Sequence, residues 1–309
     1  MVGIVASTPS PSPTSITVQF VLTGVVWGSS FLFIAIALTG MTPAQVAGGR
    51  LLFGALALGA LVAIRRERLP RSMRVWGHLC VLGASFCVVP YLLFAWAQQH
   101  VPSGLASIFN ATTPIMTAVL AWAAFRVERL RPGQLVGIGV GIVGVVVIIA
   151  PGTAAAVGES TVAQLALLGA TACYGFSLTY MRRFLGNSGL SGTAFAFGYI
   201  APAALFMVAL SPLILAEPME LTPPVVLSIV ALGVLGTGVA YVWNQNTLQA
   251  WGPTRTSTVT YITPVVGVTL GIVVLGERLT WNEPVGAAIV FVGILLVQQR
   301  LRRRRPAAA

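Results

Sequence analysis

The sequence predicts an all-α membrane protein with ten transmembrane helices, arranged as two inverted five-helix repeats with both termini in the cytoplasm. Three observations lead to this expectation. The composition is too apolar for a soluble core, ten apolar segments alternate with short loops whose arginines are unevenly distributed, and the two halves of the chain resemble each other.

The composition is that of a chain surrounded by lipid. Of its 309 residues, 56% are hydrophobic and only 8% are charged, whereas soluble domains carry about 25% charged residues. The net charge of +11 comes from arginines that lie in short clusters between apolar runs, a pattern typical of membrane topology. We therefore expect a lipid bilayer as the main partner, a multi-pass location in the cytoplasmic membrane, and no nucleic acid.

Ten segments contain enough consecutive apolar residues to cross a bilayer, which takes about 20. The connections between them are short and carry proline, glycine or charges. The predicted spans are 16–38, 43–64, 75–98, 102–125, 132–150, 160–181, 191–214, 223–247, 253–275 and 281–299.

The loop arginines set the orientation. With the N-terminus in the cytoplasm, sixteen arginines fall in inside loops and tails and only Arg278 falls in an outside loop. We expect a disordered Pro/Ser-rich tail at 1–15, a first repeat at 16–150, a second repeat at 160–299 and a basic cytoplasmic tail at 300–309.

An internal duplication relates the two halves at a nearly constant offset. The matched pairs keep the same order along both copies, which isolated coincidences in an apolar chain would not do. Pairs 150 residues apart include Tyr91 with Tyr241 and Pro114 with Pro264, pairs 149 apart include Gly137 with Gly286 and Gly144 with Gly293, and the pair Trp27 and Tyr174 is 147 apart. Each copy holds five spans, an odd number, so the second copy enters the membrane upside down, as in many secondary carriers.

The motifs of both copies resemble those of EamA-type transporters in the drug/metabolite transporter superfamily. They are WGSSF at 27–31, Arg50 after Pro43, TPIMTAVLAW at 113–122 and TPVVGVTLGIVVLGERL at 263–279. The resemblance covers about residues 18–298 and implies a secondary carrier that exports small organic metabolites, such as amino acids, by alternating access. The first-copy segment 125–130 departs from the Gly-Glu-Arg-Leu ending that the second copy keeps.

Polar side chains within the spans follow helical spacing and are the candidates for the binding of a small-molecule substrate. Polar groups in a membrane are costly and tend to face the bundle interior, although serine and threonine also serve as contacts between helices. The candidate residues are Trp27, Ser30, Arg50, Tyr91, Gln98, Asn110, Thr113, Tyr174, Ser177, Tyr241, Asn244, Gln245, Thr260 and Tyr261. Asn246 lies about 200° round the helix from Asn244 and is expected to bond a neighbouring helix or the headgroup region.

Arg50 and four prolines leave alternatives open. Arg50 lies seven residues past Pro43, roughly 10 Å inside the span, where its guanidinium either binds a substrate carboxylate or phosphate or braces helix carbonyls. Pro90, Pro114, Pro202 and Pro264 are expected to interrupt spans, either as hinges beside a cavity or as static kinks.

The alternatives from other classes are an intramembrane enzyme and a channel-like facilitator. The chain contains no Asp and no Gly-x-Ser-x-Gly motif, and its three cysteines and two histidines have no metal-site spacing. We therefore expect no catalytic residues, no metal and no cofactor. A channel would share the duplication, and the sequence is compatible with either a monomer or a homodimer.

Overall fold

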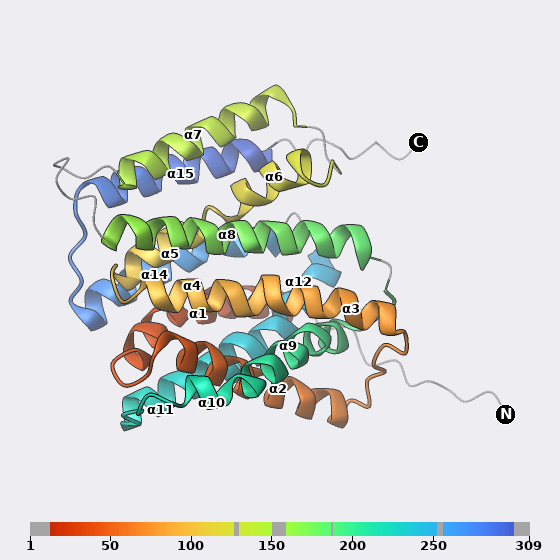
Figure 1. The fold of residues 1–309 in the computed structure, drawn as a ribbon. Coiled ribbons are helices and arrows are strands. Elements are labelled where there is room, and N and C mark those ends of the chain that lie inside the picture. The colour runs from red at the N-terminus through yellow and green to blue at the C-terminus, as the bar shows by residue number, and fades with distance from the viewer. Residues whose placement is uncertain (1–12, 127–129, 150–158, 187, 252–255, 300–309) are drawn as a thin grey trace, which may run out of the picture.

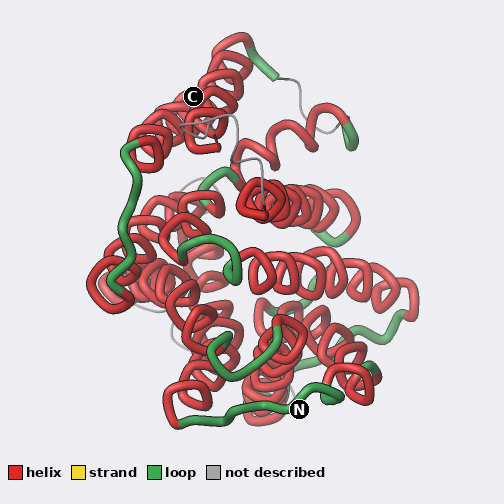
Figure 2. Tube along the Cα trace, turned by 60° about the vertical axis from the view of Figure 1, so that its left-hand side comes forward, coloured by secondary structure: helices red, strands yellow, loops and turns green. Residues whose placement is uncertain are grey.

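The protein is all-helical throughout the part that its computed structural model describes. The described residues are 13–126, 130–149, 159–186, 188–251 and 256–299, and they contain no strand (Figure 2). The helices lie roughly along one direction and form a bundle (Figure 1).

Within these residues, nine helical stretches are long and apolar enough to cross a membrane. A further apolar helix, Asn282–Gln298, is shorter than the others. The nine stretches are Pro13–Ala37, Pro43–Ile64, Met73–Ala97, Ser103–Ala123, Pro132–Ile149, Ser160–Phe184, Gly192–Ala209, Pro223–Leu248 and Thr258–Leu275. They correspond to the first nine predicted spans.

Several spans are built from more than one helical segment. The elements of the first half are α1 Pro13–Ala37, α2 Pro43–Ile64, α3 Met73–Leu82, η1 Gly83–Val88, α4 Val89–Ala97, α5 Ser103–Asn110, α6 Thr113–Ala123 and α7 Pro132–Ile149. Those of the second half are α8 Glu159–Phe184, α9 Gly192–Ala209, α10 Ser211–Ile214, α11 Pro223–Val230, η3 Ala231–Val239, α12 Ala240–Trp251, η4 Ser257–Tyr261, α14 Ile262–Leu275 and α15 Asn282–Gln299.

Of the four prolines expected to interrupt spans, three lie at a join between segments, whereas Pro202 lies inside the continuous helix α9. Pro90 follows the π-helical segment η1, Pro114 follows a turn at residues 111–112, and Pro264 follows the 3-10 segment η4. At these three joins the hydrogen-bonding pattern of the helix changes, which accommodates the missing N–H of the proline. The predicted fourth span is therefore interrupted by the turn at residues 111–112, directly before Pro114.

Two π-helical segments occupy matching places in the two halves. η1 leads into α4 and η3 leads into α12, so each precedes one of the paired tyrosines Tyr91 and Tyr241. π-helical turns add a residue to a helix and are often found at functional sites. They rotate the side chains that follow, which directs both tyrosines inward, where each is buried.

A glycine seam joins α7 to α15, which run side by side at the top of Figure 1. A Cβ atom added at Gly137 would lie 2.8 Å from the carbonyl oxygen of Gly293, and one added at Gly144 would lie 2.8 Å from that of Gly286. The absence of side chains lets the two backbones touch, which is how helices often associate in lipid. These glycines therefore provide the packing contact between the two helices.

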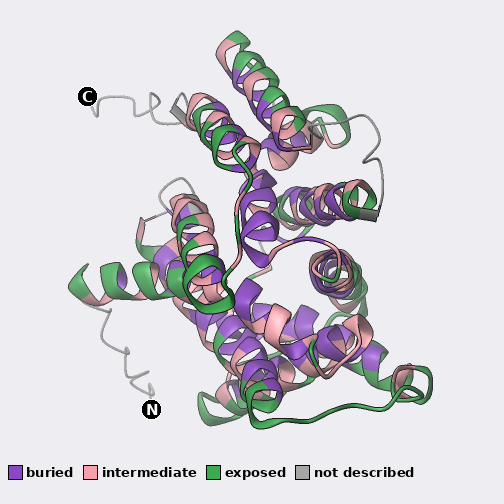
Figure 3. Cartoon of the chain, turned by 90° about the vertical axis from the view of Figure 1, so that its left-hand side faces the viewer, coloured by how far each residue is buried: buried purple, intermediate pink, exposed green. Residues whose placement is uncertain are grey.

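The outer surface of the bundle is apolar along its length. Large hydrophobic side chains such as Val273 and Leu205 are 75% and 69% exposed. Exposed residues follow the outward faces of the helices while buried residues line the inside (Figure 3). Such a surface suits contact with lipid tails rather than with water.

Most of the described arginines outside the core collect at one end of the bundle, and Arg278 in the α14–α15 connection is an exception. The α2–α3 connection and the C-terminal end of α8 lie together on the right of Figure 1. Exposed arginines at this end include Arg65, Arg66, Arg71, Arg182 and Arg183.

Candidate functional site

A cluster of aromatic side chains, here called the ring cluster, fills the middle of the bundle. Neighbouring rings meet mostly edge to face, as Trp27 does with Tyr241 at a centroid distance of 5.7 Å and Phe86 does with Tyr174 at 5.4 Å. The members of the ring cluster are Trp27, Phe31, Phe86, Tyr91, Phe94, Tyr174, Tyr199 and Tyr241.

The two matched tyrosines of the duplication meet inside the ring cluster. The hydroxyl oxygens of Tyr91 and Tyr241, which are 150 residues apart in sequence, lie 3.4 Å from each other. Trp27 donates from its indole Nε1 to the carbonyl oxygen of Gly236 at 3.1 Å, which ties α1 to the π-helical segment η3. The cluster therefore lies where the two halves of the chain meet.

Arg50 contributes the charge of this site. It lies on α2 with only 8% of its surface exposed, and its guanidinium carbon lies 3.9 Å from the centroid of the Tyr91 ring. Its Nε donates to the hydroxyl of Thr237 at 3.0 Å. Among the hydrogen bonds of the described residues Arg50 uses Nε alone, so its two terminal nitrogens are available to another acceptor.

Two predicted serines lie beside this centre. Ser30 is buried, and its hydroxyl donates to the carbonyl oxygen of Val26 in its own helix at 3.0 Å. The hydroxyl of Ser177 lies 2.7 Å from that of Ser85, a polar contact between α8 and η1. The structure thus brings together Trp27, Ser30, Arg50, Tyr91, Tyr174 and Tyr241, with Ser177 one turn from Tyr174.

Other predicted site residues take part in local contacts away from the ring cluster. Tyr261 donates to the side-chain oxygen of Gln298 on α15, and its ring lies 5.0 Å from that of Phe291. Thr113 donates to the carbonyl oxygen of Asn110 at 2.7 Å, across the break between α5 and α6. Thr260 is half-buried in the same 3-10 segment as Tyr261.

Gln98 ends α4 with an incompletely satisfied side chain. Its Nε2 donates to the carbonyl oxygen of Phe94 at 3.4 Å, while its buried Oε1 has no hydrogen-bond partner. A buried acceptor without a donor is unfavourable and is uncommon in native proteins.

The amide run on α12 divides as its helical spacing indicated. Asn244 and Gln245 are half-buried, and Gln245 packs against the start of α9, where an added Cβ at Gly192 would lie 2.5 Å from its own Cβ. Asn246 donates from Nδ2 to the side-chain oxygen of Gln19 on α1 at 2.8 Å. The expectation that Asn246 bonds a neighbouring helix is confirmed.

Two members of the site, Phe86 and Tyr199, were missed by the sequence interpretation. The centroid of the Phe86 ring lies 5.8 Å from that of Tyr199 and 6.3 Å from that of Tyr241. Both residues sit in apolar runs without a polar stripe. The duplication contained a signal for Tyr199, which lies 149 residues after Arg50.

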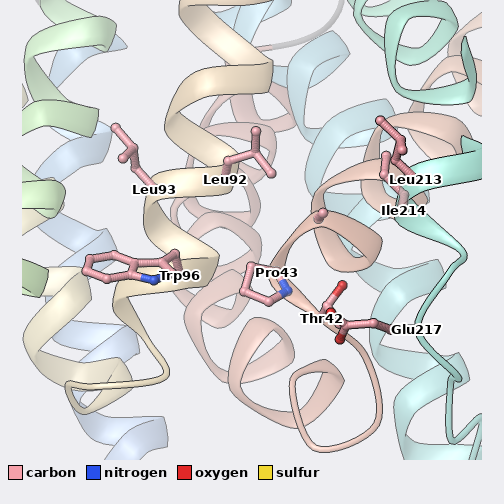
Figure 4. A pocket seen from close by; sticks show the side chains of 9 residues that line it. Thr42, Pro43, Leu92, Leu93, Trp96, Leu213, Ile214 and Glu217 are labelled. Atoms are coloured by element: carbon pink, nitrogen blue, oxygen red, sulfur yellow. The ribbon is translucent and has the colours of Figure 1, made fainter. Parts of the chain in front are cut away.

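A separate pocket of about 410 Å³ opens nearer one end of the bundle. Figure 4 shows Trp96 and Leu92 on α4 facing Pro43 across it, with Glu217 at its edge. Pro43 lies seven residues before Arg50 on α2, about 10 Å along the helix. The residues that line the pocket are Thr42, Pro43, Ala44, Leu92, Leu93, Trp96, Leu213, Ile214 and Glu217.

The site offers side chains that can bind a small solute. Around Arg50 lie rings, hydroxyls and one thiol, that of Cys87. The described residues contain no group of three or more His, Cys, Asp or Glu side chains that could hold a metal ion. Such a lining can enclose a small solute with a polar and an apolar part.

Several known transporters are similar to this chain. The chain is 29% identical over 291 residues to a probable terminal-alkyne amino-acid exporter of Streptantibioticus cattleyicolor, covering 93% of this chain and 95% of that protein. It is 28% identical to a probable amino-acid metabolite efflux pump of Escherichia coli K12, covering 91% and 94%. It is 26% identical to the uncharacterized inner membrane transporter YedA of the same strain, covering 88% and 87%.

A solved structure shares the fold. It superimposes with a TM-score of 0.64 at 20% identity, covering 93% of this chain and 99% of that one, and its title reads only "Crystal structure of protein". The profile of the EamA-like transporter family matches residues 15–150 and 161–298, nearly the whole chain. The protein therefore belongs to the EamA-like transporter family and is a multi-pass transporter of the cell membrane.

Proposed function

We propose that this transporter exports amino acids or similar small amphipathic solutes from the cytoplasm by alternating access. The observation that carries the proposal is a buried arginine, Arg50, within the ring cluster at the meeting of the two halves. Two similar proteins bear the names of amino-acid or amino-acid metabolite exporters. Secondary carriers bind substrate near the membrane midplane between their repeats.

The proposed architecture is two inverted repeats, at 16–150 and 160–299, related by an approximate two-fold axis. The meeting of Tyr91 with Tyr241 supports it, because a residue near a two-fold axis contacts its own counterpart. The glycine seam supports it as well. Gly137 touches the counterpart of Gly144, and Gly144 touches the counterpart of Gly137.

The proposed topology has ten spans, with α15 as the tenth and both termini in the cytoplasm. The gathering of exposed arginines at one end of the bundle supports this orientation. The two tails expected at 1–15 and 300–309 fall largely or wholly outside the described residues, which begin at 13 and end at 299.

The proposed substrate-binding residues divide by their distance from the centre. Trp27, Ser30, Arg50, Tyr91, Tyr174 and Tyr241 form the inner group. The outer group lines the paths toward the two membrane faces and consists of Gln98, Asn110, Thr113, Ser177, Asn244, Gln245, Thr260 and Tyr261. Pro90, Pro114 and Pro264, each beside an irregular segment, are proposed hinges.

Flux in proteoliposomes tests the proposal. Vesicles containing the purified protein are loaded with one unlabelled amino acid at a time, and the uptake of the same amino acid in labelled form is followed for each of the twenty. A carrier gives saturable uptake that is accelerated by substrate on the opposite side, whereas a channel-like facilitator gives uptake without this acceleration. Absence of uptake above protein-free vesicles for all twenty amino acids would overturn the substrate class, and a chemically altered solute would favour an intramembrane enzyme.

A further inference from the structure

We propose that Arg50, Gly236 and Ser30 form a carboxylate subsite, and that the rings around Phe86 hold the apolar end of the same substrate. This inference rests on the proposed function, because it assigns a substrate class to the proposed central site. Its basis is a comparison of the two halves of that site, residue by residue.

The first difference between the halves is one of charge. Tyr91 and Tyr241 are counterparts 150 residues apart, and Arg50 and Tyr199 are counterparts 149 residues apart. In the first half the guanidinium carbon of Arg50 lies 3.9 Å from the centroid of the Tyr91 ring. In the second half the ring of Tyr199 takes the corresponding place beside Tyr241, at a centroid distance of 6.1 Å. The same contact is therefore cationic in one half and aromatic in the other.

The second difference is one of space. Phe86 in η1 has Gly236 in η3 as its counterpart, 150 residues later. Tyr174 contacts the ring of Phe86, whereas Trp27, the counterpart of Tyr174, donates to the backbone oxygen of Gly236. A side chain thus fills one half of the site and is missing from the other.

The missing side chain leaves a narrow gap beside the charge. A Cβ added at Gly236 would lie 3.3 Å from the hydroxyl oxygen of Ser30, and 3.9 Å from both the carbonyl oxygen of Ala231 and Nη2 of Arg50. The contact with Ser30 is tight, so a ligand atom fits at this point only if the Ser30 side chain shifts by a few tenths of an ångström. An acceptor that entered here would reach a terminal nitrogen of Arg50, which has no acceptor among the described residues.

A carboxylate is the group that matches this position. A guanidinium offers parallel N–H donors that suit the two oxygens of a carboxylate, and such charged hydrogen bonds are strong away from water. Thr237 and the ring of Tyr91 hold the guanidinium in place before a ligand arrives. A buried cation within a membrane is unfavourable without a counter-charge, which the substrate would supply.

The opposite half is suited to an apolar end. The ring of Phe86 contacts those of Tyr174, Tyr199 and Tyr241 at centroid distances of 5.4, 5.8 and 6.3 Å. These rings offer faces and edges that pack against hydrocarbon or aromatic groups, and an ammonium group can lie over such a face. The substrate class is therefore an amphipathic monocarboxylate, which includes apolar amino acids and excludes amines that lack a carboxylate.

Binding to the purified full-length protein in detergent tests this assignment without requiring transport. Isothermal titration calorimetry compares 3-phenylpropionate with 3-phenylpropanamide and 2-phenylethylamine, which keep the ring but lose the negative charge. We expect 3-phenylpropionate to bind at least about tenfold more tightly than either, as is typical of one charged hydrogen bond. Equal binding of the three compounds, or preference for the amine, would overturn the inference.

Two substitutions locate the carboxylate. Arg50→Gln removes the charge and should abolish the preference for 3-phenylpropionate over its amide. Gly236→Ala fills the space beside Nη2 and should weaken binding of 3-phenylpropionate by about tenfold. Gly48→Ala is the matched control, because its added Cβ would meet only Met207 at 3.6 Å or more. If Arg50→Gln does not fold, Gly236→Ala decides alone, and unchanged binding in that variant would contradict the subsite.

The results also separate this inference from the proposed function. Arg50-dependent binding of 3-phenylpropionate without amino-acid flux would retain the subsite and reject amino-acid export. Amino-acid flux with no preference for the carboxylate in the binding series would retain export and reject the subsite.

Discussion

The glycine seam and the ring cluster are both places where the two halves of the chain meet, yet they consist of opposite kinds of residue. Along the seam, α7 and α15 meet through glycines, and their backbones approach to contact distance. In the ring cluster, bulky side chains and one cation hold the helices apart and touch mainly ring to ring. The two halves of the chain therefore meet through two different kinds of contact.

The difference follows from what each contact must do in lipid. Lipid tails are as apolar as leucine, so a lasting contact between helices relies on close packing, which glycine permits. A ring cluster with hydroxyls and a guanidinium packs less closely and contains groups that can exchange partners. We infer that the seam is the fixed contact between the halves and that the ring cluster is the contact that opens to admit substrate.

The largest expected effect comes from breaking the seam with Gly293→Val. An added Cβ at this position would lie 2.6 Å from the backbone nitrogen of Gly141 and 2.7 Å from the carbonyl oxygen of Gly137, and backbone atoms cannot move aside cheaply. We expect a loss of at least about 3 kcal/mol of folding free energy, measured by thermal unfolding in detergent and by the yield of monodisperse protein.

The control for the seam is Gly139→Val on the same helix. Gly139 is exposed, and an added Cβ there would meet nothing within 4 Å. This variant should unfold at the temperature of the parent protein. Equal stability of the Gly293→Val and Gly139→Val proteins would show that the seam is not the fixed contact.

The second effect tests the ring cluster through Tyr241→Ala. The substitution removes a buried ring that contacts Trp27, Phe86 and Tyr199. We expect flux in proteoliposomes to fall to background, while the protein remains folded as judged by gel filtration. Tyr241→Phe keeps the ring and loses only a long hydroxyl contact of 3.4 Å, so it should retain most of the flux. Normal flux in Tyr241→Ala would remove the ring cluster from the transport path.

The third effect concerns a carboxylate in the second half of the chain that contacts the N-terminus of a helix in the first half. Glu277, just after α14, accepts hydrogen bonds from the backbone nitrogens of Ser103 and Gly104 at 2.6 and 2.9 Å, at the N-terminus of α5. Glu277→Gln removes the charge that favours a helix N-terminus and should lower the folding free energy by about 1 kcal/mol. The measurement is again thermal unfolding, with Glu220→Gln as the control, because Glu220 is exposed. An unchanged melting temperature in Glu277→Gln would show that this charge adds no stability.

The smallest effect sharpens the edge of the site. Asn244 is half-buried on α12, one turn beyond Tyr241, and Asn244→Ala should reduce flux about threefold, or about 0.7 kcal/mol, without loss of folded protein. Asn246→Ala is the matched comparison, because it breaks the bond to Gln19 and should lower stability rather than flux. Reduced flux in Asn246→Ala and reduced stability in Asn244→Ala would place the edge of the site on the other face of α12.

Much of the fold follows from local properties of the sequence. Runs of about 20 apolar residues must become helices in lipid because no water is present to satisfy the backbone, and nine such helices appear where they were predicted. Pro90, Pro114 and Pro264 marked joins between segments, whereas Pro202 lies inside the continuous helix α9. The duplication indicated which tyrosines correspond, and these two tyrosines meet.

The residues of the candidate site follow less completely from the sequence than the fold does. Helical spacing selected Trp27, Tyr91 and Tyr241, and depth within a span selected Arg50; all four lie in or against the ring cluster. The same reasoning selected Tyr261, which instead faces Gln298 on α15. Spacing along one helix gives the relative directions of its side chains but not the direction in which the bundle axis lies.

The sequence by itself therefore determined a helical membrane protein of the EamA type, because apolar length and repeated motifs are properties of the chain alone. Only the tertiary structure showed that the rings of Phe86 and Tyr199 pack into the ring cluster, while Tyr261 contacts Gln298 on α15. It also placed the missing side chain of Gly236 beside Arg50. The physical reason is that these contacts join helices that are distant in sequence, and the pattern along one helix does not specify which neighbour its faces meet.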